Sequence, residues 1–174
     1  MSDNPWEARY VSVVRHGGHQ RFFERFMEAV DIESLVIVSP WITPMRDEFP
    51  LSSIIDRINR HAIPTIVIMR HPTKEPMNRE AAELLSDCEH VALYHNNDLH
   101  AKIYVCRCAP FGFALLSSAN LSGRATRAHE IGLMIEGKGP GTEIIEELGL
   151  VGQQDIPNRA GTIKASPAEG RYRH

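Results

Sequence analysis

The sequence predicts a single α/β domain in which a mixed β-sheet is flanked by helices. In the first half of the chain, apolar β-branched segments alternate with amphipathic segments, which is the pattern of parallel strands joined by helices. In the second half, three strand-like segments follow one another closely, which favours antiparallel pairing. The chain has 174 residues, of which 43% are hydrophobic, and this is enough apolar material for one sizeable core.

Seven segments have the composition and alternation of β-strands. The first is "YVSVV", followed by the apolar runs "SLVIVSP", "PTIVIM" and "HVALYH", and then by "AKIYVCR", "GFALLSS" and "HEIGLMIE". In the same order they cover residues 10–14, 34–40, 64–69, 90–95, 101–107, 112–118 and 129–136. The continuous apolar runs indicate strands that are covered on both faces.

Four further segments have the apolar spacing of helices that bury one face. They cover residues 19–30, 51–61, 78–87 and 141–150. The first shows the pattern most clearly, because Phe22, Phe23 and Phe26 fall on one side of the helix together with Ala29 and Val30.

The chain divides into residues 1–150, which form the domain, and residues 151–174, which we expect to be a loose C-terminal tail. From Gly152 onwards the sequence has few large apolar residues and no helix or strand period. The sequence contains no internal repeat, so any active-site motif is present in a single copy.

Charge and cysteine content restrict the class of protein only weakly. The formal net charge is −3, so the chain lacks the strongly basic balance of many nucleic-acid binders, although a local basic groove remains compatible with it. No apolar run approaches the roughly 20 residues that span a bilayer, and no stable membrane association is expected. Three cysteines form no even disulfide framework, which favours a reducing, cytoplasmic setting.

Five polar residues near the last three strands form a set that suits a phosphate. His100 and Lys102 are two positions apart at the start of a predicted strand, so their side chains are expected to project to one face. Ser118 and Asn120 follow the next strand, and Glu130 opens the last one. A lysine, small hydrogen-bonding groups and a histidine supply a point charge, neutral donors and a reacting group.

At these residues the chain resembles the phospholipase D superfamily. The signature of that superfamily reads H-x-K, then an Asp, then G-S-x-N. Here the first part stands as "HAK" (100–102) and the last as "SSAN" (117–120), with Ser117 in place of the usual Gly. Arg107 stands where the family usually has its Asp, and the downstream Glu130 fits the family layout.

The resemblance implies a phospholipase D-like fold and a metal-independent phosphodiesterase that needs no cofactor. His100 would attack phosphorus to form a phosphohistidine, which water then resolves, while a second histidine protonates the leaving oxygen. Lys102 and Asn120 would hold the non-bridging oxygens, Ser118 would hydrogen-bond the phosphate or orient its neighbours, and Glu130 would orient the His100 ring. Because the chain has one motif copy, the second histidine would come from another subunit, which predicts a two-fold homodimer with a shared site.

With its single motif and short chain, the protein resembles the compact bacterial nuclease branch of this family, which implies a nuclease that acts on DNA or RNA. A phospholipase or phosphatidyl transferase is disfavoured, since no membrane-docking segment is evident. Arg107 and Ser117 keep open a third possibility, a non-catalytic phosphate-binding or nucleic-acid-binding module of a larger system.

Several of these residues are also compatible with ordinary structural roles. Trp41 is expected either to line the substrate groove or to belong to the core. Arg124 and Arg127 are candidate contacts to a nucleic-acid backbone, with plain surface charge as the alternative. His100 could be an ordinary surface or core histidine, and Ser118 with Asn120 could form a turn or a helix cap. For the cysteines of the "CRC" stretch, buried inert thiols are favoured over a zinc site.

Overall fold

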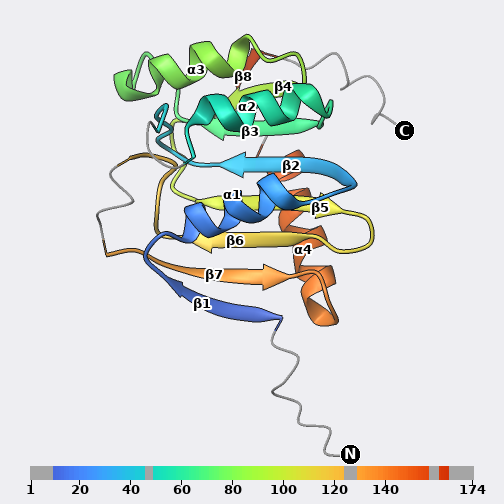
Figure 1. The fold of residues 1–174 in the computed structure, drawn as a ribbon. Helices are drawn as coiled ribbons and strands as arrows, with labels where there is room; N and C mark the ends of the chain where they lie inside the picture. The colour runs from blue at the N-terminus through green and yellow to red at the C-terminus, as the bar shows by residue number, and fades with distance from the viewer. Residues whose placement is uncertain (1–9, 46–48, 124–128, 157–160, 165–174) are drawn as a thin grey trace, which may run out of the picture.

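The structure, a computed structural model, describes residues 10–45, 49–123, 129–156 and 161–164 and contains one mixed eight-stranded sheet (Figure 1). Its strands are β1 (Val11–Arg15), β2 (Ile32–Val38), β3 (Thr65–Met69), β4 (Val91–His95), β5 (Ile103–Cys108), β6 (Phe113–Ser117), β7 (Ile131–Glu136) and β8 (Gly161–Lys164). They are ordered β1-β7-β6-β5-β2-β3-β4-β8. Only the pairs β2–β3 and β3–β4 are parallel, and all other neighbours are antiparallel. The predicted mixed sheet is therefore confirmed.

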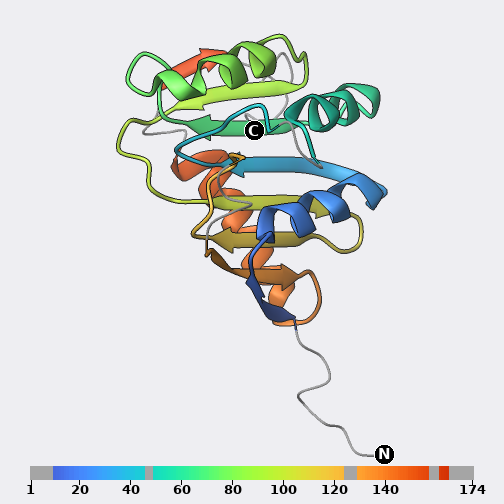
Figure 2. The same cartoon turned by 60° about the vertical axis from the view of Figure 1, so that its left-hand side comes forward.

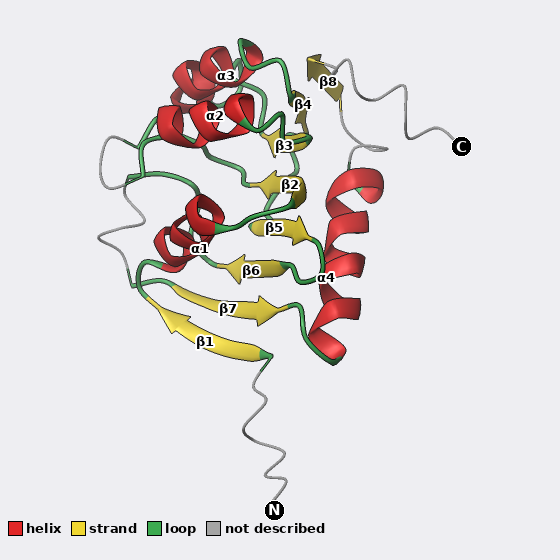
Figure 3. Ribbon diagram, turned by 45° about the vertical axis from the view of Figure 1, so that its right-hand side comes forward, coloured by secondary structure: helices red, strands yellow, loops and turns green. Residues whose placement is uncertain are grey.

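The helices are α1 (Gly18–Glu28), α2 (Leu51–Arg60), α3 (Arg79–Ser86) and α4 (Pro140–Leu150), with the short turns η1 (Pro76–Asn78) and η2 (Val151–Asp155). Helices α1, α2 and α3 cover one face of the sheet, and α4 covers the other (Figure 3). Every strand and helix that the sequence predicts is present, with its ends shifted by only a few residues.

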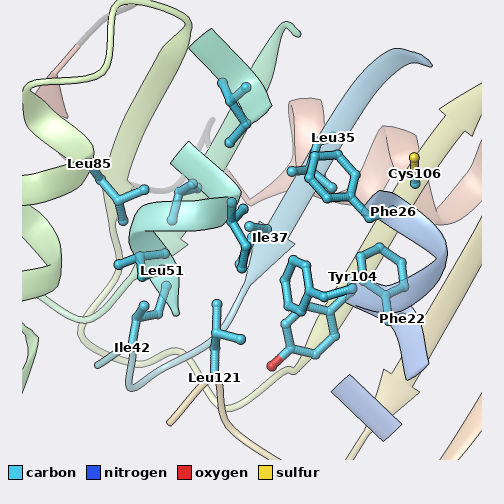
Figure 4. Close-up of a cluster of buried hydrophobic side chains, with 14 of the residues drawn as sticks. Phe22, Phe26, Leu35, Ile37, Ile42, Leu51, Leu85, Tyr104, Cys106 and Leu121 are labelled. Carbon is cyan, nitrogen blue, oxygen red and sulfur yellow. The ribbon is translucent and has the colours of Figure 1, made fainter. Parts of the chain in front are cut away.

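Each face of the sheet has its own hydrophobic core. The larger core lies under α1, α2 and α3 and includes the fully buried rings of Phe22, Phe26 and Tyr104 (Figure 4). The smaller core lies under α4 and contains Ile145 of this helix together with Val36 and Val105 of the central strands. Covering on both faces explains why the central strands are nearly continuous apolar runs.

The prediction of a loose tail is wrong for the part of the tail that the structure describes. Residues 151–155 continue α4 as η2, and β8 pairs antiparallel with β4. Small residues make both contacts possible: a Cβ at Gly152 would come within 2.3 Å of Val36 Cγ1, and one at Gly161 within 2.2 Å of His95 Nε2. A four-residue edge strand that is held mainly by backbone pairing carries too little apolar sequence to be recognised by period.

Strand directions bring several connections to one edge of the sheet. Because β5 and β7 are antiparallel to β6, and β5 is antiparallel to β2, the ends of β1, β2, β3, β4 and β6 meet the beginnings of β5 and β7. We call this edge, with its connecting segments 16–17, 39–45, 70–75, 96–102, 118–123 and 129–130, the site edge. It is the edge at which the arrowheads of β2 and β6 end in Figures 1 and 2.

No helix within the described residues is long and apolar enough to cross a membrane.

Candidate active site

The segment after β6 holds Ser118 and Asn120, and neighbouring segments fix it in place. The buried hydroxyl of Tyr104 donates to the Ala119 carbonyl at 3.1 Å. The Leu121 N–H donates to Ser39 Oγ at 3.0 Å, and this hydroxyl donates in turn to the Trp41 carbonyl at 2.9 Å. The tip of the "SSAN" motif is therefore attached both to the strand that carries Tyr104 and to the segment after β2.

Ser118 and Glu130 lie side by side at the ends of β6 and β7. The Ser118 hydroxyl donates to the Glu130 carboxylate and accepts from the Ile131 N–H at 3.1 Å. The Ser118 N–H donates to the Ile131 carbonyl at 3.0 Å, so the backbone pairing of the two strands continues to this point. Two of the predicted site residues are thus in direct contact.

His100 and Lys102 lie just before β5, and not on it as the sequence predicted, because β5 begins at Ile103. Lys102 still continues the strand pairing, since its carbonyl accepts from the Ser117 N–H at 3.2 Å. The Lys102 ammonium donates to the His100 carbonyl at 2.9 Å. The imidazole of His100 is exposed, as a reacting group must be if substrate is to reach it. The segment 100–102 therefore lies next to the segment of Ser118 and Asn120.

Asn120 has unused hydrogen-bonding capacity. Its side-chain Oδ1 is buried and lacks a hydrogen-bond partner among the described residues. Buried polar atoms in native proteins usually have a partner, so an orphaned amide at a strand end next to Ser118 is where a bound ligand would find one. Because Oδ1 accepts and an ionised phosphate oxygen also accepts, only the Nδ2 donor of Asn120 can hold phosphate, and its predicted role remains a prediction.

Arg70 is a site-edge residue that the sequence did not single out. It follows β3, and its Nη2 lies 3.3 Å from His100 Nε2 and 3.5 Å from His100 Nδ1. Its guanidinium also contacts Glu75, and its carbon Cζ lies 4.9 Å from the centre of the Trp41 ring. Trp41, predicted as a groove residue or a core residue, is half-buried and stacks on this cation.

The Glu75 carboxylate accepts hydrogen bonds from two residues of the same cluster. Hydrogen bonds from Trp41 and then from Arg70 hold the pKa of the Glu75 carboxyl below its usual range. Glu75 therefore stays ionised at neutral pH and fixes both of its partners.

Glu130 also has a histidine neighbour that the sequence did not reveal. His19, in the first turn of α1, is only 4% exposed, and its Nδ1 has no hydrogen-bond partner within the described part of the chain. Burial lowers the pKa of His19, and the nearby Glu130 carboxylate opposes that shift. In the sequence, His19 is simply one residue of a predicted amphipathic helix. No local pattern distinguishes it from the other residues of that helix.

The predicted orientation of His100 by Glu130 stays a prediction. In the structure, the Glu130 carboxylate accepts a hydrogen bond from Ser118, whereas the ring of His100 faces Arg70. Arg124 and Arg127 lie outside the described residues, so the structure says nothing of their predicted contacts.

Arg107, which stands where the family signature has an acid, is not at the site edge. It lies five residues along from Lys102, about 16 Å at the rise of a strand. There it forms an ion pair with Glu146 of α4 at 2.9 Å and lies 3.9 Å from Glu33. At this position the side chain attaches α4 to the sheet.

The structure offers no metal site in the residues that it describes. No group of three or more His, Cys, Asp or Glu side chains is placed to hold an ion there. Cys106 and Cys108 have their sulfur atoms 3.6 Å apart, with Cys106 buried on the core side of β5.

Comparison with solved structures assigns the fold. NucT from Helicobacter pylori matches 87% of this chain over 98% of its own, with a TM-score of 0.64 and 15% sequence identity. Nuc from Salmonella typhimurium, a phospholipase D family member, matches 89% of this chain over 99% of its own, with a TM-score of 0.64 and 13% identity. The chain has the phospholipase D fold.

A third similar structure is TrmBL2, an archaeal chromatin protein with a novel mode of DNA binding. It matches 94% of this chain with a TM-score of 0.54 and 11% identity, and this chain spans 57% of the length of TrmBL2. No model of a known protein family and no curated protein sequence matches the chain. At these identities the similarity establishes the phospholipase D fold and leaves the chemistry to the site itself.

Proposed function

We propose that this protein is a metal-independent phosphodiesterase that hydrolyses nucleic acid. One observation carries the proposal: on a phospholipase D fold, the segment of His100 and Lys102 and the segment of Ser118 and Asn120 lie next to each other at one sheet edge. An exposed imidazole beside a lysine, with the Asn120 amide on the neighbouring segment, supplies a nucleophile and hydrogen-bond donors for a phosphate.

In the proposed reaction a nitrogen of His100 attacks phosphorus, and the bond from phosphorus to the leaving oxygen breaks. A second imidazole gives its proton to that oxygen, so the cleaved strand departs as an alcohol. Water then attacks the phosphohistidine, gives a proton to the second imidazole and releases His100. Lys102 and Asn120 hold the non-bridging oxygens, on which negative charge increases during each attack.

The second imidazole is proposed to be His100 of another copy of the chain, in a two-fold homodimer. A two-fold axis that passes beside the site edge places two identical residues on opposite sides of one phosphate, which suits attack from one side and protonation on the other. One dimer then contains one composite site.

The test of the activity uses the purified chain with supercoiled plasmid, single-stranded DNA and RNA, each in EDTA. We expect cleavage of at least one nucleic acid at a rate that EDTA leaves unchanged, because the proposed chemistry uses no metal ion. Phosphatidylcholine vesicles in the same buffer serve as the lipid control. Cleavage that requires added magnesium, or release of the lipid headgroup without any cleavage of nucleic acid, contradicts the proposal.

A subunit-mixing experiment tests the shared site. Wild-type chain is mixed with an equal amount of His100→Ala chain and allowed to exchange subunits fully. If both imidazoles are needed, only wild-type dimers act. The mixture then has about one quarter of the activity of wild-type chain at the same total chain concentration. About one half of the activity would instead show that each chain acts alone.

A second candidate function is a non-catalytic module that binds DNA, which the likeness to the chromatin protein TrmBL2 favours. This function predicts that nucleic acid binds without turnover and that His100→Ala leaves the affinity unchanged.

A further inference from the structure

Arg70 is held in place along its whole length. Its N–H donates to the Pro40 carbonyl at 3.2 Å, and its own carbonyl accepts from the Asn78 amide at 2.8 Å. The backbone of Arg70 is thus attached to the segment after β2 and to η1. A side chain that starts from so fixed a point loses little further freedom when it binds a ligand.

The guanidinium is fixed in turn, and its side chain is only 14% exposed. Its Nε donates to the Leu99 carbonyl at 3.0 Å, its Nη1 pairs with Glu75 at 3.0 Å, and its Cζ lies over the Trp41 ring. A guanidinium has five N–H donors in a rigid fork. The contacts through Nε and one Nη1 donor leave the Nη2 end of the fork directed at His100.

The position of Nη2 relative to His100 leaves the imidazole free to react. The two distances, 3.3 Å to Nε2 and 3.5 Å to Nδ1, are nearly equal. A hydrogen bond to one ring nitrogen lies in the ring plane and points away from the other nitrogen. An atom that is almost equidistant from both nitrogens is therefore in line with neither, and Arg70 makes no in-line hydrogen bond to His100.

We propose that Arg70 is a phosphate-binding residue of this site and that Trp41 is the platform that positions it. A phosphate approaching a His100 nitrogen in the ring plane would reach the free donors of Nη2, and a guanidinium binds phosphate oxygens in pairs. Glu75 and the Leu99 carbonyl keep the fork turned toward that place. This assignment rests on the proposed function only in that a phosphate binds beside His100.

In this proposal Trp41 positions the Arg70 guanidinium and does not stack on a nucleobase of the substrate. The indole gives one face to Arg70 and hydrogen-bonds Glu75, so both contacts serve the guanidinium. Removal of the ring would lower affinity even for a phosphate that carries no base.

The test measures the binding of inorganic phosphate by titration calorimetry in the full-length chain. Arg70→Met is expected to weaken binding about tenfold or more, because one charge-assisted contact is lost. Trp41→Leu is expected to weaken phosphate binding as well, by a smaller factor. Arg70→Lys keeps the charge without the fork and should recover only part of the affinity. The control is Arg60→Met, which removes the same charge from the exposed end of α2, at the opposite edge.

A second measurement excludes a purely structural effect. The affinity for a single-stranded oligonucleotide is followed against salt concentration, and Arg70→Met should reduce the slope of the double-logarithmic plot by about 0.7. Circular dichroism melts identify variants that are unfolded. If Arg70→Met is one of them, Arg70→Lys is compared with the wild type in its place.

The outcomes separate this inference from the proposed function. Loss of phosphate binding in Arg70→Met while the wild type shows no turnover would support Arg70 and refute the enzyme. Phosphate binding at wild-type strength in Arg70→Met, or no binding in the wild type, would overturn the role of Arg70 even if the chain cleaves nucleic acid.

Discussion

His100→Ala is expected to lower the rate of phosphodiester cleavage by at least about 10³-fold, because the variant has no nitrogen to attack phosphorus and no acid for the leaving oxygen. The loss should appear in single-turnover cleavage of whichever nucleic acid the wild type cuts. Binding of nucleic acid should persist, since Lys102 and Asn120, the proposed ligands of the phosphate, remain.

The matched control is His61→Ala, which removes an exposed imidazole at the end of α2. It lies at the edge opposite His100 and should cleave at the wild-type rate. A quenched reaction with phosphorus-labelled substrate provides a direct check, because the label should remain on the peptide that contains His100 in the wild type. Cleavage by His100→Ala at more than a few per cent of the wild-type rate would place the nucleophile elsewhere.

Asn78→Ala is expected to lower the free energy of unfolding by about 3 kcal/mol, since several buried polar groups would lose their partner at once. Asn78 is fully buried. Its Oδ1 accepts from the Ile42 N–H at 2.9 Å, and its Nδ2 donates to the carbonyls of Pro40 at 2.9 Å and Arg70 at 2.8 Å. These bonds join the segments that carry Trp41 and Arg70, so phosphate binding should weaken as well.

Urea unfolding monitored by circular dichroism measures the effect. The control is Met77→Ala in the same turn, where a side chain that is 44% exposed is shortened and a change within about 0.5 kcal/mol is expected. If Asn78→Ala and Met77→Ala unfold at the same urea concentration, the Asn78 network does not stabilise the site edge.

Local sequence patterns were sufficient to predict the strands and helices of this domain. The runs "SLVIVSP" and "PTIVIM" have no polar face because α1, α2 and α3 cover one side of the sheet and α4 with η2 covers the other. The same patterns placed Ser118 at a strand end, which is where the structure has it, whereas His100 and Lys102 precede β5 and do not lie on it. They failed at β8, whose four residues are held by backbone pairing with β4 and have no apolar period of their own.

By itself, the sequence determined the order of the elements and the two short motifs, because both depend on residues that are near one another along the chain. Only the tertiary structure decided which distant residues surround those motifs. Arg70 lies 30 positions before His100 and meets it because β3 and β4 run parallel and end at the same edge. His19 reaches Glu130 because α1 packs across β6 and β7. Such contacts arise from strand order and direction, and no local period in the chain encodes them.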